Sequence, residues 1–408
     1  MGNADHVVAT APLSRVRLEH LHRVMAAHVR SGGMPGLVTL VYRRGEVHVD
    51  AVGRQTLGGS NPMRRDTIFR IASMTKPIAA AAAMILVEEC RLGLDDPVDH
   101  WLPELADRQV MRRLDGPLDD TVPAHRPITL RDLLTLRMGL GHILAPAADY
   151  PIRRKMDELG LLLGPPQPQA PPTPYEWMRR VGTLPLMRQP GEEWMYDLGL
   201  DVLGVLIARV ADRPLDVFLR ERLFEPLGMR DTGFHVPREK LGRLAGSYVA
   251  NPAQWSLDVY DGIDDSQWAR PPAFASAAGG LVSTVDDYLA FCCMLLDKGK
   301  HGRERILSST SVDLMTTDQL TPEQRAANRM FFGDHSGWGF GLSVNLRRDD
   351  LARNPGRFGW DGGLGTSAYT DPSEDTIAIL MTQRVMDSPE PPRVFTDFWA
   401  SVHQVIED

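Results

Sequence analysis

The sequence predicts an α/β (α+β) protein in which both ends of the chain contribute to one sheet and a mainly helical region lies between them. Near the N-terminus, residues 37–42 and 47–52 are rich in valine and flank a polar turn, which is typical of a β-hairpin. The C-terminal third contains further strand-like segments at residues 339–346, 357–360, 367–370 and 376–382. We therefore expect a discontinuous sheet domain, residues 1–94 with 270–408, and an inserted, mainly helical domain, residues 95–269.

Helices are predicted where apolar residues recur at helical spacing. The first, residues 16–29, stops at the glycines that follow Ser31. A second, alanine-rich helix should begin within one turn of Ser73 and end at Gly93, because glycine commonly closes helices. Further helical segments are found at residues 129–136, 197–210, 215–224, 285–296 and 394–406.

The inserted region alternates short helical pieces with proline-rich connectors. The richest connector, residues 164–174, should be extended and partly mobile because proline fixes the backbone and removes hydrogen-bond donors. Two interpretations remain open, a lid near a binding site and a passive connector, and the connector is the one favoured here.

Composition excludes several functional classes. The hydrophobic content of 43% and charged content of 24% are typical of a soluble globular protein, and the net charge of −8 argues against a nucleic-acid partner. The three cysteines form neither a disulfide framework nor a metal-binding spacing. The first eight residues contain no signal-peptide core, and the longest apolar run, residues 78–87, is about half a membrane span. We therefore expect a cytoplasmic protein with no membrane partner.

A serine and a lysine three residues apart mark the start of the alanine-rich helix. Residues at this spacing share a helix face, and Pro77 is tolerated only near the helix start. A hydroxyl beside an amine at a helix N-terminus can form an activated nucleophile. The pair Ser73 and Lys76 is short enough to arise by chance, so an N-capping serine and a surface lysine are the structural alternatives.

Other catalytic and cofactor motifs are missing from the sequence. There is no Gly-x-Ser-x-Gly elbow, no His-Glu-x-x-His, no Cys-x-x-Cys and no Walker loop. Residues 363–368 match a dinucleotide-binding fingerprint, but a strand-like segment follows them rather than a helix. We therefore expect no cofactor and no metal.

Two later segments supply partners for Ser73 and Lys76. Tyr196 lies between a turn and a helix, and the glycines of residues 358–366 allow a ligand to approach a strand closely. Ser-x-x-Lys, then Tyr-x-Asn, then Lys-Thr-Gly on a late strand is the pattern of serine β-lactamases and penicillin-binding proteins, which this chain resembles. The resemblance spans roughly residues 18–400. It is closest to the class C-like branch, which includes the family VIII carboxylesterases and related acyltransferases. Three further segments also resemble this branch: residues 130–140, 223–234 and 280–288.

The resemblance implies a β-lactamase-like fold, with a mainly antiparallel sheet flanked by helices and the site between the sheet and the helical domain. Ser73 corresponds to the acylated nucleophile. Lys76 corresponds to an amine that helps to take the proton of this serine, and desolvation can lower the pKa of such an amine. Tyr196 corresponds to the partner base, whose phenolate form is favoured by the charge of the lysine. The amide groups of Ser73 and Gly363 correspond to the oxyanion hole.

Two of the motifs depart from the family pattern. Leu198 stands where the family has the asparagine that binds the acyl amide of a β-lactam or peptide. Trp360, Asp361 and Gly362 replace Lys-Thr-Gly, which removes the cation that meets a substrate carboxylate. We expect these four residues to bind substrate and to favour neutral, partly apolar molecules. A structural Asp361, bonded to nearby backbone, is the alternative.

Together these residues predict a serine hydrolase of the carboxylesterase type, which cleaves small esters or transfers their acyl groups through an acyl-Ser73 intermediate. A D-amino-acid amidase or peptidase, or a weak β-lactamase, is an alternative that the missing asparagine disfavours. A non-catalytic binding homologue is the alternative from another class, and the joint presence of Ser73, Lys76 and Tyr196 argues against it.

Overall fold

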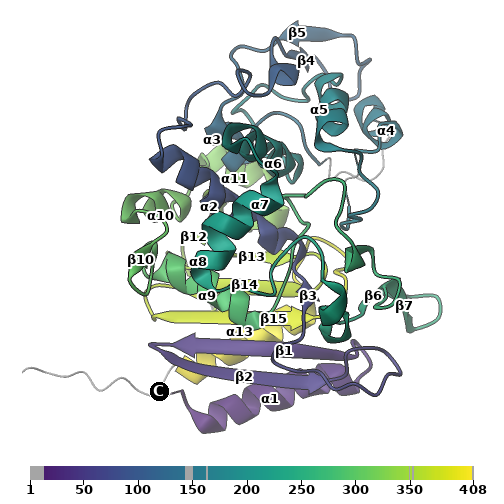
Figure 1. Ribbon diagram of the computed structural model, residues 1–408, viewed down its shortest axis with the longest axis vertical. Helices are drawn as coiled ribbons and strands as arrows, with labels where there is room; N and C mark the ends of the chain where they lie inside the picture. Colours follow the sequence, from purple (N-terminus) through teal and green to yellow (C-terminus); the bar gives the residue numbers. More distant parts are fainter. Residues whose placement is uncertain (1–12, 143–149, 162–163, 349, 352, 407–408) are drawn as a thin grey trace, which may run out of the picture.

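The computed structural model describes residues 13–142, 150–161, 164–348, 350–351 and 353–406. These residues form a sheet with helices on both faces and a helix-rich region at one end (Figure 1). The N-terminal segment on which the signal-peptide prediction depends lies outside the described residues. Within the described part of the chain, no helix is both long and apolar enough to cross a membrane.

Among the described residues, the central sheet has seven strands, and every neighbouring pair is antiparallel. In spatial order the strands are β11 (Ser336–Trp338), β12 (Ser343–Asn345), β13 (Phe358–Gly362), β14 (Thr366–Asp371), β15 (Thr376–Thr382), β1 (Gly36–Arg43) and β2 (Glu46–Gly53). The N-terminal hairpin thus pairs with the last strand, with Leu40 opposite Ile379. Both ends of the chain complete one mainly antiparallel sheet, which confirms the predicted fold class.

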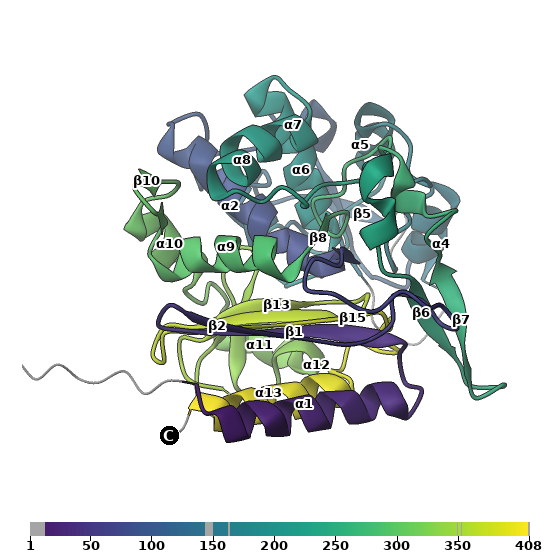
Figure 2. The ribbon, with the colours of Figure 1, turned by 60° about the horizontal axis from the view of Figure 1, so that its bottom comes forward.

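Helices cover both faces of this sheet (Figure 2). On one face, α1 (Arg15–Arg30) and α13 (Arg393–Ile406) lie side by side over a core that includes Leu21, Val41 and Phe398. On the opposite face, α2 (Thr75–Glu88) and α9 (Val285–Leu296) belong to the main core, which continues into the helix-rich region. Strands β1 and β15, in the middle of the sheet, are therefore buried on both sides, whereas the edge strand β2 is partly exposed.

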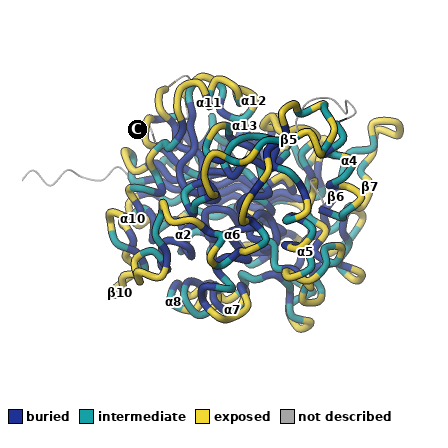
Figure 3. The backbone as a smooth tube through the Cα atoms, turned by 90° about the horizontal axis from the view of Figure 1, so that it is seen from above, coloured by how far each residue is buried: buried dark blue, intermediate teal, exposed yellow. Residues whose placement is uncertain are grey.

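The helix α2 is buried on every side over residues 75–86. Figure 3 shows that exposed backbone gathers in the outer loops, whereas buried segments run through the middle of the molecule. The helix begins after a 3₁₀ turn at Ala72–Met74, within one turn of Ser73 as expected. It ends at Glu88 rather than Gly93, because Cys90 adopts a left-handed conformation (φ 56°) and Arg91 donates its N–H to the Leu86 carbonyl.

The remaining elements are short helices and two-stranded ladders. The helices are α3 (Leu130–Leu134), α4 (Pro151–Glu158), α5 (Pro174–Gly182), α6 (Leu198–Ala211), α7 (Leu215–Leu219), α8 (Glu225–Leu227), α10 (Ser309–Met315), α11 (Pro322–Ala327) and α12 (Arg329–Phe332). The ladders are β3 (Phe69–Arg70) with β8 (Val282–Ser283), β4 (Gln109–Met111) with β5 (Thr121–Pro123), β6 (Ser247–Asn251) with β7 (Ser256–Asp261), and β9 (Lys300–His301) with β10 (Glu304–Arg305). The predicted domain boundaries stay a prediction.

One predicted strand is divided in the structure. Residues 339–346 do not form a single strand, because a turn at residues 339–342 separates β11 from β12. At this turn Gly341 has a φ of 72°, and a Cβ there would lie 2.7 Å from the Lys76 carbonyl oxygen. The turn therefore packs directly on α2 and needs glycine at its closest point.

Candidate active site

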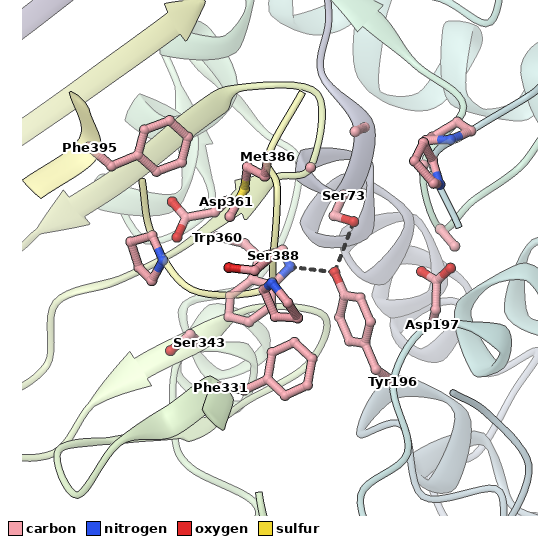
Figure 4. Close-up of a pocket in the computed structure, with 18 of the residues that line it drawn as sticks. Ser73, Tyr196, Asp197, Phe331, Ser343, Trp360, Asp361, Met386, Ser388 and Phe395 are labelled. Carbon is pink, nitrogen blue, oxygen red and sulfur yellow. Dashed lines mark hydrogen bonds between the residues drawn. The ribbon is translucent and has the colours of Figure 1, made fainter. Parts of the chain in front are cut away.

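Ser73 lies in the 3₁₀ turn that precedes α2. The residue before it, Ala72, has a φ of 44°, a conformation that residues other than glycine rarely adopt and that is enriched at functional sites. The neighbouring backbone is fixed, because Ile71 donates its N–H to the Leu281 carbonyl over 3.0 Å. Ser73 thereby lines a cavity of about 580 Å³, whose walls come from the sheet and from the helix-rich region (Figure 4).

Lys76 is fully buried, and its ammonium group makes three polar contacts. Its Nζ lies 2.9 Å from Ser73 Oγ and donates to the Ala278 carbonyl over 2.7 Å. The third contact is an ion pair of 2.5 Å with the Asp197 carboxylate. Burial has the largest single effect and lowers the pKa of Lys76, but Asp197 and Tyr196 together outweigh it, so the pKa is raised above its ordinary value. Lys76 therefore stays a cation, contrary to the expectation that desolvation would lower its pKa.

Tyr196 faces Ser73 from the start of α6, with 2.8 Å between Tyr196 Oη and Ser73 Oγ (Figure 4). The indole N–H of Trp360 donates to the same Tyr196 oxygen over 2.9 Å. The Tyr196 ring lies among other aromatic rings, and its centre is 5.5 Å from that of Trp194 and 5.1 Å from that of Phe331. These contacts fix the orientation of the tyrosine. The Lys76 ammonium lies 4.5 Å from the centre of the tyrosine ring. A tyrosine oxygen that contacts Ser73 Oγ and accepts an N–H beside a cation is a candidate for proton transfer with that serine.

Two aspartates that sequence reasoning missed support Lys76. Asp197 has φ 87° and ψ −67°, a rare and strained combination that turns its carboxylate towards the lysine. Asp201, one helical turn later, accepts hydrogen bonds from Ser276 Oγ (2.7 Å) and from the Ala278 N–H (3.0 Å). Asp201 thus positions the residue whose carbonyl binds Lys76. Burial, and secondarily repulsion by Asp197, raise the pKa of Asp201 to about 7.

His142 closes the other side of this charged cluster. Its backbone N–H donates to the Tyr196 carbonyl over 2.9 Å, and its ring meets the tyrosine ring edge-on with 6.0 Å between centres. The imidazole Nε2 lies 3.9 Å from the Asp197 carboxylate. Burial lowers the pKa of His142 in spite of that carboxylate, so the ring is neutral at pH 7. Nothing in the sequence indicated that His142 would pack beside Tyr196.

The predicted oxyanion-hole residues line the same cavity. Gly363 follows β13 and has open space beside its Cα, and Ser73 lines the cavity from the 3₁₀ turn before α2. The preceding residue, Gly362, does not line the cavity; a Cβ there would lie 2.3 Å from the Ile71 carbonyl oxygen. Thr366 Oγ1 also donates to that carbonyl over 3.2 Å. Gly362 therefore holds the strand against the segment that carries Ser73. That the amides of Ser73 and Gly363 form an oxyanion hole stays a prediction.

A family model described as Beta-lactamase matches residues 21–396 of the chain. The chain belongs to the β-lactamase family. Protein Rv1367c of Mycobacterium tuberculosis is 39% identical over 369 residues, which cover 88% of each protein. Esterase EstB of Burkholderia gladioli is 31% identical over 384 residues, which cover 89% of each. The solved structure of EstCE1, a hydrolase with promiscuous acyltransferase activity, matches with a TM-score of 0.79 at 26% identity over 95% of this chain and 98% of its own. The predicted β-lactamase-like fold is thereby confirmed.

The residues that depart from the β-lactamase family pattern take different places in the structure. Leu198 is the first residue of α6 and is buried in the core, away from the cavity. Trp360 does line the cavity, but its N–H is directed at Tyr196. Asp361 projects from the opposite face of β13, where it accepts a 2.5 Å hydrogen bond from Ser367 Oγ. Burial raises the pKa of Asp361. The bonds of Asp361 therefore go to side chains of β14 rather than to nearby backbone.

The proline-rich segment forms part of the cavity wall. Pro165, Pro166 and Pro168 line the cavity, and the Pro166 carbonyl accepts a hydrogen bond of 2.7 Å from Tyr260 Oη. Gln169 Nε2 also donates to the Gln267 carbonyl over 2.9 Å. The proline-rich segment is thus attached at two points, to Tyr260 and to the Gln267 carbonyl. Both interpretations of the segment, a lid and a passive connector, stay predictions.

The contact between Trp360 and Tyr196 predicts the effect of a substitution. In Trp360→Phe, Tyr196 loses the hydrogen bond that the indole N–H donates to its oxygen. We expect kcat/KM for a p-nitrophenyl ester to fall roughly ten- to a hundredfold, as for loss of a hydrogen bond to a charged group. Trp268→Phe, which removes an indole hydrogen bond of equal length (2.9 Å) from a side chain that does not line the cavity, serves as the control. An unchanged kcat/KM in Trp360→Phe would contradict the assignment.

The ion pair between Asp197 and Lys76 predicts a change at alkaline pH. Without the carboxylate, in Asp197→Asn, only Tyr196 still opposes the effect of burial, so the pKa of Lys76 falls. We expect activity to require the cation, so the alkaline limb of kcat/KM should move down by roughly one pH unit or more. Stopped-flow assays from neutral to alkaline pH measure this limb. Superimposable profiles of wild type and variant would show that Asp197 does not set the charge of Lys76.

Proposed function

We propose that this protein hydrolyses small carboxylic esters through an acyl-Ser73 intermediate. One observation carries the proposal: Ser73 Oγ lies 2.8 Å from Tyr196 Oη and 2.9 Å from a buried Lys76 cation, at the wall of a cavity large enough for a small ester. Family membership and the similarity to EstB and EstCE1 support this reading of the site.

In the proposed mechanism Tyr196 is the general base. Its ionised oxygen takes the Ser73 proton as Oγ attacks the ester carbonyl, and the amides of Ser73 and Gly363 bind the oxyanion that forms. The tetrahedral intermediate collapses, the C–O bond to the alcohol breaks, and Tyr196 returns the proton to the departing alcohol oxygen. Water then attacks the acyl-Ser73 ester with Tyr196 again as base, which releases the acid and regenerates the serine. Lys76 remains a cation throughout.

The side chains around Ser73 favour esters over amides and β-lactams. The buried Leu198 offers no amide group to the acyl side of a substrate, and Trp360 directs its only N–H at the catalytic base. A β-lactam or peptide would leave its own amide and adjacent carboxylate unpaired in this part of the cavity, at a cost typical of buried polar groups. Transfer of the acyl group to a second alcohol shares the same acyl-enzyme, so hydrolysis and transfer differ only in the last nucleophile.

Covalent labelling tests the proposal. Intact-mass analysis after treatment with a fluorophosphonate should show one adduct on the wild-type protein, and peptide mapping should locate it at Ser73. The Ser73→Ala variant should show neither the adduct nor turnover of p-nitrophenyl butyrate, while its melting temperature stays close to that of the wild type. The absence of an adduct on the wild type, or an undiminished adduct on the variant, would exclude Ser73 as the nucleophile.

A further inference from the structure

The cavity extends past Ser73 to the other face of the sheet. Along β13, Phe358 and Trp360 point into the main core, whereas Asp361 points to the opposite face. Among the described residues the strand β12 pairs only with Phe358 and Gly359, so no strand pairs with this edge of β13 at Trp360 and Asp361. Both Trp360 and Asp361 line the cavity, which therefore passes around this edge. Figure 4 shows Asp361 and Phe395 on the side of Trp360 that lies away from Ser73 and Tyr196.

The far end of the cavity contains a buried arginine whose charge is not matched by a hydrogen bond. Arg357 is 5% exposed, and its guanidinium lies between two aromatic rings, 4.0 Å from the centre of Tyr369 and 4.1 Å from that of Trp399. Its Nη2 is buried and meets no acceptor among the described residues, and none of their carboxylates lies within ion-pair distance of it. Burial lowers the pKa of Arg357 to about 10, so the group remains charged at pH 7.

A second unused donor lies beside this arginine. Asn345 is the cross-strand neighbour of Arg357: its N–H donates to the Arg357 carbonyl over 2.8 Å, so both side chains emerge on the same face. The amide oxygen of Asn345 accepts from Ser336 Oγ over 3.1 Å, whereas its Nδ2 is buried without a partner. Both Arg357 and Asn345 line the cavity. Buried donors without acceptors are rare in folded proteins, and two on one wall indicate a missing anionic acceptor.

The nearest carboxylates are occupied by other partners. Asp361 accepts from Ser367 Oγ, and Tyr369 Oη lies 3.4 Å from its second oxygen. Asp371 accepts from Asn354 Nδ2 over 2.7 Å and from the hydroxyl of Ser373 over 2.6 Å. These groups therefore do not neutralise the guanidinium by direct contact, and the wall keeps its two donors for a ligand.

We propose that this end of the cavity binds a carboxylate at the far end of an ester substrate, held by Arg357 and Asn345. The inference rests on the proposed function and deepens it by naming the substrate class: esters in which one half is an alkyl chain that ends in a carboxylate. Trp399 and Phe395 supply apolar walls for the chain. Arg357 lies three strand residues from Trp360, roughly 10 Å, so the carboxylate belongs well away from the bond that is cleaved. The expectation that the site favours neutral substrates over carboxylates then applies only to the part of the substrate next to the bond that is cleaved.

Matched substrates test this proposal. One pair is the p-nitrophenyl monoester of octanedioic acid and its neutral isostere, in which a carboxamide replaces the free carboxylate. A second pair carries the same groups on the alcohol half of a butyrate ester. For at least one pair, wild-type kcat/KM should be roughly tenfold or more higher for the carboxylate. In Arg357→Gln this ratio should fall to near one, and Arg357→Lys should retain part of it.

Arg43→Gln is the control variant. Arg43 is also a buried arginine with unpartnered nitrogens, but it does not line the cavity, so the ratio should stay at its wild-type value. If both pairs give ratios of one or below in the wild type while the neutral esters are hydrolysed, the carboxylate subsite is wrong and the esterase stands. If no ester is hydrolysed, the esterase is wrong, and calorimetry with the monomethyl ester of octanedioic acid still tests the subsite. Binding that Arg357→Gln abolishes supports it; no binding, or equal binding by that variant, overturns it.

Discussion

The Tyr196→Phe variant should lose roughly two to four orders of magnitude in kcat/KM for p-nitrophenyl butyrate, the range that removal of a general base typically costs. The expected loss is large because Lys76 cannot replace the base: its ion pair with Asp197 keeps it protonated. Phenylalanine preserves the ring contacts with Trp194 and Phe331, so the fold and the cavity should be retained. Steady-state kinetics together with the rate of fluorophosphonate labelling measure the effect on the first chemical step.

A remote tyrosine provides the control for this experiment. Tyr248 is buried outside the cavity, and its hydroxyl accepts a 2.8 Å hydrogen bond from the Leu57 N–H, as short as the contact between Tyr196 and Ser73. Tyr248→Phe should therefore leave kcat/KM within a factor of a few, whatever it does to stability. If Tyr196→Phe retained more than about a tenth of wild-type activity, Lys76 would have to act as the base, and the charge assigned to it would be wrong.

The parts of the fold that follow local rules could be predicted from the sequence. The strand at residues 376–382 and the helix at residues 285–296 have the expected bounds, because an unbroken apolar strand and a capped amphipathic helix are both defined within their own segments. That both ends of the chain share one sheet also follows from the hairpin and the late strands, whereas its antiparallel pairing was implied by the family resemblance. The division of residues 339–346 into two strands could not be predicted, because it depends on contact between Gly341 and α2.

The candidate site likewise has residues that could be predicted from the sequence and residues that could not. Ser73, Lys76 and Tyr196 stand at recognisable spacings, and the chain folds so that they meet. The role of Asp197 depends on a backbone conformation that aspartate adopts only under tertiary constraint, so the sequence carried no signal for it. Arg357 carries no motif either. Its position is defined by strand alternation and by two aromatic rings, from β14 and α13, that are distant in the sequence. Contacts between distant elements are what local patterns cannot supply.

The raised pKa of Asp201 predicts that the free energy of unfolding decreases as pH rises from about 4 to about 7. Its pKa is about 7 in the folded protein and 3.8 in the unfolded chain, so over this interval the folded state holds a proton that the unfolded state has released. The unfolded state is then favoured progressively as pH increases. A difference of this size corresponds to at most roughly 4 kcal/mol, and to less where water in the cavity reaches the carboxylate.

The Asp201→Asn variant isolates this contribution. Asparagine keeps an oxygen that can accept from Ser276 and from the Ala278 N–H, and it resembles the protonated acid at every pH. Urea denaturation should give similar free energies of unfolding for variant and wild type near pH 4.5, and a more stable variant near pH 8. Other groups titrate in both proteins, so their effects cancel in the comparison. A difference that does not change with pH would mean that Asp201 is ionised throughout, held so by the Lys76 cation in spite of its repulsion by Asp197.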